Sequence, residues 1–386
     1  MSDESPVRVG GEGTAASAER WPRRIAMLGF LPNPQPVPRD MTTLIEGLVP
    51  ARVEVDLLLP PRVRGNPLDI RVPVGRYCLD LSDPAAALAA LDRYAGERRP
   101  DVILSNRDKA GAVLVRLSGE HALRIARIGT NVMEKTKGKH LLARWRTRRR
   151  LAAVLAEADG LIAVSEGACS ALHRLFRGRT APPIARVHSP IDMDAISKSA
   201  AAAARHPWLA EKDQPVILSA GRLVRTKDYP TLIKAFERVL QHRDCRLMIL
   251  GEGRQRRKLE SLIERLGLAD AVALPGFVPD PFPFMARADL FVLSSRFEGF
   301  GNVLAEALAV GTTCISTDCE SGPREILGDG RYGALVPVGS VSGLANAISR
   351  SLERPAEPQR LREAALRFER DTVVDQFLRT LRAMRR

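Results

Sequence analysis

The sequence has few cysteines, few aromatic residues and no long apolar run. Its five cysteines are scattered and never spaced as Cys-x-x-Cys, which predicts reduced thiols in a cytosolic protein and neither a disulfide framework nor a cysteine metal site. The apolar runs stop well short of the roughly 18–20 residues that a membrane-spanning helix needs. Aromatic residues make up only 5%, few for a nucleic-acid surface built on stacked rings. A soluble globular protein is therefore expected.

Length and composition predict two domains of ordinary size. The chain has 386 residues, of which 45% are hydrophobic and 27% charged, enough for two hydrophobic cores. Residues 1–24 are polar and contain no apolar core, so no secretory signal is expected. We predict a disordered tail over residues 1–22, a first domain over 23–195, a second over 196–365, and a C-terminal helix over 366–386 that could cross back to the first domain.

Segments typical of strands and helices alternate along the whole chain, which favours parallel sheets covered by helices on both faces. An alanine run between prolines predicts the domain junction within residues 190–207. The expected strands are 25–30, 53–58, 102–105, 125–129, 161–164, 216–220, 246–250, 272–274, 290–293 and 312–316. The expected helices are 84–94, 141–157, 229–241, 255–266, 303–310 and 341–352, with one or two more in 360–386.

The positive charge is concentrated in one stretch. The formal net charge is +14, and residues 121–150 carry ten basic side chains against one acidic side chain, Glu134. Three interpretations stay open: a solvated helix face, a contact with an anionic membrane or lipid phosphates, or a nucleic-acid surface. Nucleic acid is not expected, because Trp145 is the one aromatic residue in the cluster.

Two positive charges lie on a loop that directly follows a predicted strand. Residues 221–228, Gly-Arg-Leu-Val-Arg-Thr-Lys-Asp, come after strand 216–220 and before a helix. Ligands of open parallel sheets bind beyond the carboxyl ends of the strands. Arg222 and Lys227 would suit a diphosphate there. The alternative is an exposed basic turn that is capped by Asp228.

Two acidic residues, spaced by seven others, follow the predicted strand 290–293. Glu298 lies in a polar loop with Gly299 and Gly301, and Glu306 is the one charged residue in the apolar stretch 303–310. A carboxylate in such a helix costs several kcal/mol unless something binds it. The pair could grip a polyhydroxylated ligand, with glycine amides approaching an oxyanion. Alternatively, Glu306 pairs with an arginine inside its own domain.

No metal site is expected. Asp192-Met193-Asp194 matches a three-residue Asp-x-Asp metal motif of another transferase fold, but so short a match arises easily by chance. His188 and His140 are interpreted as surface or junction residues. No grouping of serine or cysteine with histidine stands out.

Several longer motifs resemble a known family in order and spacing. They are GRLVRTKDYPTLIKAFERV, LMILGEG, LPGFVPD and SSRFEGFGNVLAEALAVGTTCISTDCESGPREIL, with PDVILSN, ADGLIAVSEGA and SPID as weaker matches nearer the N-terminus. Together they resemble retaining GT-B glycosyltransferases of the family-four, group 1 type, especially bacterial surface-polysaccharide enzymes. The resemblance implies two Rossmann-like α/β domains facing a cleft, the first on the acceptor side and the second binding a nucleotide sugar.

The resemblance also implies roles for the matching residues. Arg222 and Lys227 would bind the donor diphosphate, Glu298 would contact the transferred sugar and Glu306 the ribose. Further donor-binding positions are Gly221, Phe277, Val278, Gly299, Phe300, Gly301 and Asn302, of which Phe277 and Val278 would lie against the nucleobase.

The first domain departs from the family pattern in two places. Residues 31–36 read Leu-Pro-Asn-Pro-Gln-Pro where family members carry paired glycines, and Gly129-Thr130-Asn131 stands where many have a histidine. Thr130 and Asn131 are therefore candidate acceptor-side residues.

The implied activity is transfer of a hexose or N-acetylhexosamine from a nucleotide diphosphate sugar, with retention of configuration and without cofactor or metal. The implied partners are that donor, a glycan or lipid-linked acceptor and an anionic membrane surface, reached through residues 121–150. We expect a cytoplasmic protein, peripheral at the inner membrane. The alternatives are a sugar-nucleotide 2-epimerase of the same architecture and a non-catalytic nucleotide-sugar-binding protein.

Overall fold

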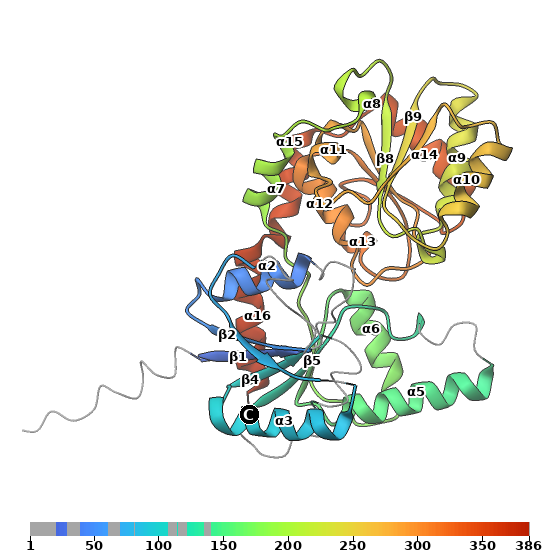
Figure 1. Cartoon of the computed structure of the whole chain (residues 1–386). Helices are drawn as coiled ribbons and strands as arrows, with labels where there is room; N and C mark the ends of the chain where they lie inside the picture. Colours follow the sequence, from blue (N-terminus) through green and yellow to red (C-terminus); the bar gives the residue numbers. More distant parts are fainter. Residues whose placement is uncertain are drawn as a thin grey trace, which may run out of the picture.

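The computed structural model describes residues 21–28, 39–60, 70–80, 82–106, 114, 122–134 and 140–385. These residues form two α/β domains, one above the other in Figure 1, each built on a parallel sheet. The predicted fold class is thereby confirmed. The predicted tail, except for residues 21 and 22, and the loop 31–36 lie outside the described residues.

The first sheet has seven parallel strands in the order β3-β2-β1-β4-β5-β6-β7. The chain order reverses between β1 and β4, the kind of switch point at which ligands bind in open α/β sheets. The strands are β1 (Arg24–Leu28), β2 (Glu54–Leu59), β3 (Gly75–Cys78), β4 (Val102–Ser105), β5 (Leu123–Ile128), β6 (Gly160–Ala163) and β7 (Ile184–Arg186).

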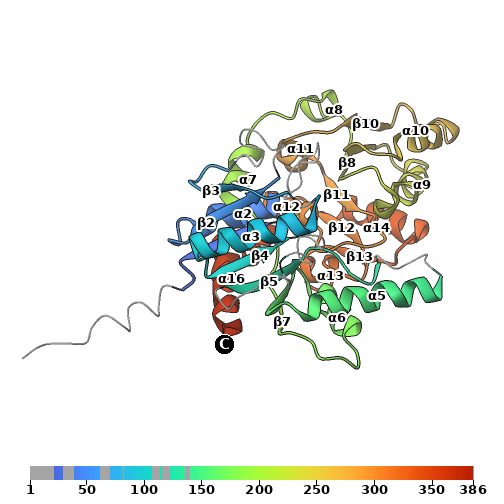
Figure 2. The same ribbon diagram turned by 60° about the horizontal axis from the view of Figure 1, so that its bottom comes forward.

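Helices cover both faces of the first sheet, because successive strand residues point to opposite faces. Met27 packs with α2 (Arg39–Leu48) and α16 (Arg370–Met384) on one face. Its neighbours in β1 pack with α3 (Pro84–Arg98) on the other, where α5 (Leu141–Ala156) and α6 (Glu166–Leu175) cover β5 and β6. Helices α3 and α5 lie along the bottom of Figure 1 and come forward in Figure 2.

The second sheet has six parallel strands in the order β10-β9-β8-β11-β12-β13. The order in which the chain adds strands reverses between β8 and β11. Its central strands are entirely buried, which explains why they read as unbroken apolar runs. The strands are β8 (Val216–Ala220), β9 (Arg246–Leu250), β10 (Val272–Gly276), β11 (Leu290–Leu293), β12 (Cys314–Thr317) and β13 (Ala334–Val336).

The second sheet is likewise covered on both faces. Ile217 of β8 packs among α9 (Tyr229–Leu240), α10 (Arg256–Arg265) and α14 (Val341–Glu353), whereas Leu218 faces the opposite layer. The helices of that opposite layer are α7 (Met193–Ala200), α8 (Pro207–Ala210), α11 (Phe282–Arg287), α12 (Asn302–Val310), α13 (Pro323–Ile326) and α15 (Pro358–Ala365).

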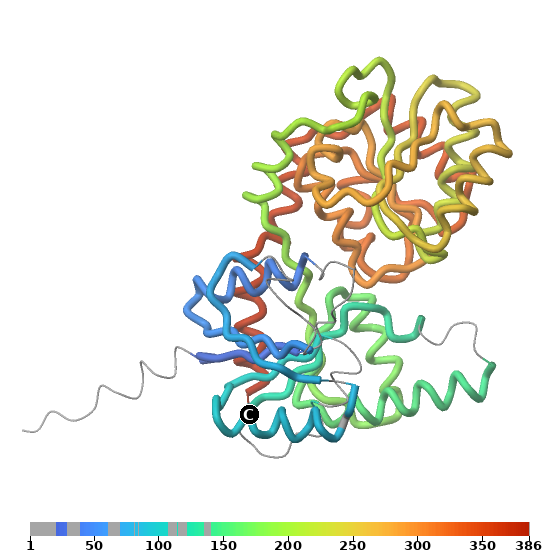
Figure 3. The backbone as a smooth tube through the Cα atoms, in the orientation of Figure 1, coloured from blue at the N-terminus to red at the C-terminus, as the bar shows by residue number. Residues whose placement is uncertain are grey.

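The chain crosses between the domains twice, and the two crossings lie side by side (Figure 3). The amide of Ile191 donates to the carbonyl of Phe368 at 2.8 Å, and the amide of Arg370 donates back to Ile191 at 2.9 Å. After the short turn η3 (Leu366–Phe368), α16 buries Val373, Phe377 and Leu381 in the core of the first domain. The C-terminal helix thus belongs to the first sheet in space, although it follows the second in sequence.

The predicted strands and helices match the observed ones to within a few residues, with two kinds of error. Strands β3, β7 and β13 were missed because they are edge strands of only three or four residues that are only partly buried. Several helices were missed as well, among them α7 (Met193–Ala200), which lies within the stretch 190–207 that was predicted to hold the domain junction. Among the described residues, no helix is long and apolar enough to span a membrane.

We expect Phe377→Ala to lower the free energy of unfolding by about 3 to 5 kcal/mol, because it leaves a cavity between α16 and the first sheet. Urea unfolding followed by circular dichroism measures this change, with Arg379→Ala on the exposed side of the same helix as control. Equal stability of the two variants would contradict the packing of α16 described above.

Candidate functional site

Helix α12 holds one buried carboxylate. Glu306 is only 5% exposed, and its neighbours Leu304, Ala305, Ala307 and Leu308 are buried apolar residues. Oε1 accepts a hydrogen bond at 3.1 Å from Arg39, which lies in the first domain, whereas the buried Oε2 has no hydrogen-bond partner among the described residues. Burial raises the pKa of Glu306, and Arg39 opposes this rise without cancelling it. A carboxylate oxygen in this state is ready to accept from a ligand hydroxyl.

Glu298 and Lys227 form an ion pair at the carboxyl ends of β8 and β11. Lys227 Nζ donates to Glu298 Oε1 at 2.6 Å, and Ser295 Oγ donates to the same oxygen at 2.6 Å. Lys227 ends the short turn η2 (Arg225–Lys227), and its carbonyl accepts a hydrogen bond from Ser294 Oγ at 2.8 Å. The loops that follow the two adjacent strands are therefore locked together, as the strand order requires.

The beginning of the basic loop contains Gly221 and Arg222. Gly221 has φ +151°, and a Cβ there would lie 3.1 Å from Cε of Lys227, so glycine leaves room for the lysine. The side chain of Arg222 is exposed on the same loop. Asp228 stands at the N-cap position of α9, but its side chain does not bond a backbone amide of that helix. It accepts a hydrogen bond from Thr231 Oγ1 and pairs with Arg296 instead.

The loop after β10 carries Phe277 and Val278. Phe277 is 56% exposed, unusually so for a large apolar side chain. Next to them, the carbonyl of Pro279 accepts a hydrogen bond from Arg39 at 3.1 Å. Arg39 therefore contacts both this loop and Glu306, which brings the predicted nucleobase-side and ribose-side positions next to each other.

The loop between β11 and α12 packs directly on the first domain. A Cβ on Gly299 would lie 2.0 Å from the carbonyl oxygen of Gly129 and 3.1 Å from Cα of Thr130, so no larger residue fits without movement. Asn131 is 1% exposed, and its amide donates to Ser321 Oγ of the second domain at 3.3 Å. The structure thus brings the candidate acceptor-side loop 129–131 against the candidate donor loop 298–302.

Several residues at the domain interface were missed by the sequence analysis, among them Ser165 and Glu325. Ser165 Oγ donates to the carbonyl of Gly299 at 2.7 Å. Glu325 accepts hydrogen bonds from the amide of Glu166 at 2.9 Å and lies 3.2 Å from His188 Nε2. Burial alone would raise the pKa of Glu325, but the bonds from His188 and the Glu166 amide outweigh it, so the pKa is lowered. These partners are far apart in the chain, and no local signal links them.

The remaining predicted positions divide into core and loop residues. Phe300 is 3% exposed, and its ring lies 5.4 Å from that of His188 and 5.2 Å from that of Phe368, so its side chain is a packing residue. Gly301 has φ +103° and caps α12, and Asn302 is the first residue of that helix. The alternative in which Glu306 pairs within its own domain is wrong, because its partner Arg39 belongs to the first domain.

The Asp192-Met193-Asp194 motif has a structural role. Asp192 caps α7 by accepting from the amide of Ala195 at 2.9 Å, and it pairs with Arg370 at 2.9 Å. Over the described ranges, no group of three or more metal-ligating side chains is found.

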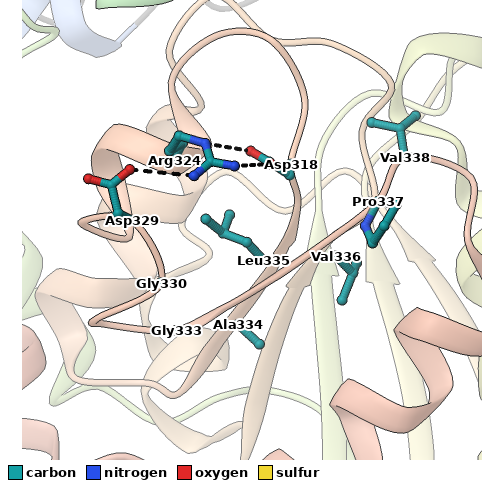
Figure 4. Close-up of a pocket in the computed structure, with 10 residues that line it drawn as sticks. All are labelled: Asp318, Arg324, Asp329, Gly330, Gly333, Ala334, Leu335, Val336, Pro337 and Val338. Atoms are coloured by element: carbon teal, nitrogen blue, oxygen red, sulfur yellow. Dashed lines mark hydrogen bonds and ion pairs between the residues drawn. The ribbon is translucent and has the colours of Figure 1, made fainter.

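A separate pocket lies beside β13, away from these residues (Figure 4). It is lined by Arg324 between Asp318 and Asp329 and by the chain from Gly333 to Val338. None of the predicted site residues lines it.

A family model and several known proteins are similar to part of this chain. Residues 202–368 match the model of the family Glycosyl transferases group 1. The chain is 40% identical over 156 residues to the N-acetylgalactosamine-N,N'-diacetylbacillosaminyl-diphospho-undecaprenol 4-alpha-N-acetylgalactosaminyltransferase of Campylobacter jejuni, a match covering 40% of this chain and 41% of that protein. It is 36% identical over 174 residues to the lipopolysaccharide core biosynthesis glycosyltransferase LpsE of Rhizobium meliloti, covering 44% and 50%.

The likeness to solved structures extends over both domains. The crystal structure of Anabaena Alr3699/HepE in complex with UDP superposes with a TM-score of 0.72 at 21% identity, covering 94% of this chain and 100% of that one. At this identity the likeness shows the fold alone, which is GT-B. The two curated relatives above match over half of their length or less. Residues 202–368 are therefore similar to the group 1 glycosyltransferases, and the chain as a whole has the GT-B fold.

We expect Glu306→Gln to raise the free energy of unfolding at neutral pH, because it removes a buried charge. Since the pKa of Glu306 is raised in the folded state, the loss of stability that its buried charge causes in the wild type reaches its full size above that pKa. It shrinks as the pH falls and is gone below 4.5, the pKa of an unperturbed glutamate. Urea unfolding at several pH values measures the difference between the two proteins.

The matched control is Glu264→Gln, an exposed glutamate in the same domain, which should change stability by about 0.5 kcal/mol or less. A Glu306→Gln variant less stable than wild type at neutral pH would show that the carboxylate contributes to the fold.

Proposed function

We propose that this protein is a glycosyltransferase that moves a hexose or N-acetylhexosamine from a nucleotide diphosphate sugar to a glycan or lipid-linked acceptor in cell-surface polysaccharide biosynthesis. The observation that carries the proposal is the Lys227–Glu298 pair at 2.6 Å, followed on α12 by the buried Glu306, whose Oε2 has no hydrogen-bond partner among the described residues. A lysine suits the donor phosphates and the carboxylates suit sugar hydroxyls. The family match of residues 202–368 supports the same assignment.

The proposed reaction retains the configuration at the anomeric carbon. The bond from that carbon to the donor phosphate breaks, and a bond to an acceptor hydroxyl oxygen forms on the same face. The departing phosphate oxygen takes the hydroxyl proton. Arg222 and Lys227 stabilise the charge that develops on the leaving nucleoside diphosphate, so that neither a metal nor a tuned general base is required.

The other residues of the site position the two substrates. Glu298 accepts from hydroxyls of the transferred sugar, and Glu306 accepts from the ribose. Amides of Gly299, Phe300, Gly301 and Asn302 face the donor, and Gly221, Phe277 and Val278 complete its binding site. Thr130 and Asn131 lie on the acceptor side, where Gly129 meets Gly299. The Campylobacter jejuni relative has a diphospho-undecaprenol acceptor in its name, which supports a lipid-linked acceptor.

We expect Lys227→Ala to lower kcat by about 10²- to 10³-fold, because the leaving diphosphate loses a direct positive partner. Release of nucleoside diphosphate from a panel of nucleotide sugars, with lipid-linked oligosaccharide as acceptor, measures the rate. The control is Lys234→Ala, an exposed lysine on α9.

Near-normal turnover of Lys227→Ala would refute the role of Lys227. Conversion of the donor without acceptor would instead favour a sugar-nucleotide 2-epimerase. Nucleotide-sugar binding without transfer or hydrolysis would favour a non-catalytic binding protein.

Helix α5 supports a membrane contact on the acceptor domain. Near its start it exposes three large apolar side chains, Leu141 at 75%, Leu142 at 64% and Trp145 at 54%. Arg149 lies over the Trp145 ring at 5.2 Å, and Arg146 and Arg150 are exposed on the same helix. Apolar side chains beside arginines suit the interface of an anionic bilayer. We propose that α5 holds the protein, as a cytoplasmic peripheral protein, on the inner membrane surface.

We expect the triple variant Leu141→Ser, Leu142→Ser, Trp145→Ala to bind anionic liposomes about tenfold more weakly than wild type, because the apolar anchors are lost. Flotation with and without anionic lipid measures the binding, and Leu366→Ser, at an exposed leucine elsewhere, is the control. Equal recovery on neutral and anionic liposomes would count against the contact, and strongly salt-dependent binding to DNA would favour nucleic acid.

A further inference from the structure

Arg39 of the first domain makes three contacts with the second domain. Its guanidinium donates to Glu306 Oε1 and to the carbonyl of Pro279, both at 3.1 Å, and lies 4.9 Å from the centre of the Phe282 ring. These partners belong to α12, to the loop after β10 and to α11. The Arg39 side chain is still 45% exposed, so a molecule entering the site can reach it. The arginine thus closes one side of the predicted nucleoside position.

The first domain holds the start of α2 in place through the next residue. Asp40 is 5% exposed and accepts hydrogen bonds from Arg127 Nη2 at 2.6 Å and from Ser189 Oγ at 2.9 Å. Arg127 on β5 is itself 5% exposed, so this is a buried ion pair, which is costly to break from one side. Because Asp40 is held by the first domain, the contact of Arg39 with Glu306 depends on how the two domains are arranged.

Arg39 leaves one oxygen of Glu306 available. It occupies Oε1, while Oε2 is buried without a hydrogen-bond partner in the part of the chain that the structure describes. A buried acceptor without a donor costs free energy, which a ligand hydroxyl would recover. Arg39 also favours the ionised carboxylate against burial and against the nearby acids Asp40 and Asp280. Because Arg39 occupies Oε1, a hydroxyl that approaches this carboxyl group meets Oε2.

We propose that Arg39 is a positioning residue for the donor's nucleoside, holding Glu306 by Oε1 so that Oε2 faces a ribose hydroxyl. This inference rests on the proposed function, and it adds that the first domain takes part in nucleoside recognition. The exposed part of the guanidinium covers the nucleoside from the acceptor side, above Phe282. Binding of a nucleoside diphosphate is consequently coupled to the arrangement of the two domains.

The test uses the full-length protein and isothermal titration with UDP, CDP, ADP and GDP. The tightest of the four is then compared with its 2′-deoxy form. We expect Arg39→Ala to weaken binding at least about tenfold, the loss typical of a charged hydrogen bond. The preference for the ribose form should fall as well. The KM of the donor should rise by more than kcat falls.

Two further measurements separate positioning from a merely structural effect. Without Arg39, Glu306 ionises only at higher pH, so the affinity of Arg39→Ala should recover as the pH is raised. Arg39→Lys, which keeps the charge, should restore part of the affinity and of the ribose preference. The matched control is Arg71→Ala, which removes another arginine paired with a glutamate of α2, Glu46, at 3.9 Å.

The possible failures are distinguishable. If Arg39→Ala binds as wild type does while Glu306→Ala binds weakly, the inference about Arg39 is overturned and the donor site stands. A wild type that prefers the 2′-deoxy form also overturns the inference. If wild type binds none of the four nucleotides, the proposed function fails together with it.

Discussion

The site depends on acidic side chains that the fold keeps away from water at the carboxyl end of β11. Glu306 lies in a helix that is apolar apart from its first residue, Asn302, and among the described residues its Oε2 has no hydrogen-bond partner. Glu298 is nearly buried too, but Lys227 and Ser295 satisfy it. Burying carboxylates in this way costs stability. Groups that raise the free energy of the folded state at the end of a parallel sheet are typical of a binding site rather than of a core.

The two domains meet through small residues and short side chains. Gly299 lies against Gly129, and a Cβ on Gly167 would be 2.1 Å from the carbonyl of Glu320, so the backbones are in direct contact. Ser165, Asn131 and Glu325 add polar bonds across the same interface. Two chain crossings, at Ile191 and Phe368, run alongside it. An interface of this kind holds the domains in register, and it has only two covalent connections about which they can move.

Much of the fold could be predicted from local pattern, for a simple reason. Strands β8, β9 and β11 are buried on both faces, so they read as apolar runs between polar loops. The edge strands β3, β7 and β13 pair with one neighbour each, and they are too short and too exposed to give a clear pattern. Helix α16 could be predicted as a helix, but only the folded chain places Phe377 in the core of the first domain.

The candidate site also has one part that follows from local sequence and another that only the tertiary structure decides. The sequence by itself determined the local part: an apolar strand, a glycine-bearing loop and two glutamates at a spacing that puts one in the loop and the other on the helix behind it. It also placed Arg222 and Lys227 directly after a strand. Tertiary structure alone decided that Arg39 meets Glu306, that Asn131 meets Ser321 and that His188 meets Glu325. Those pairs are separated by more than a hundred residues, and hydrogen bonds act over about 3 Å, so only the packing of two sheets can bring them together.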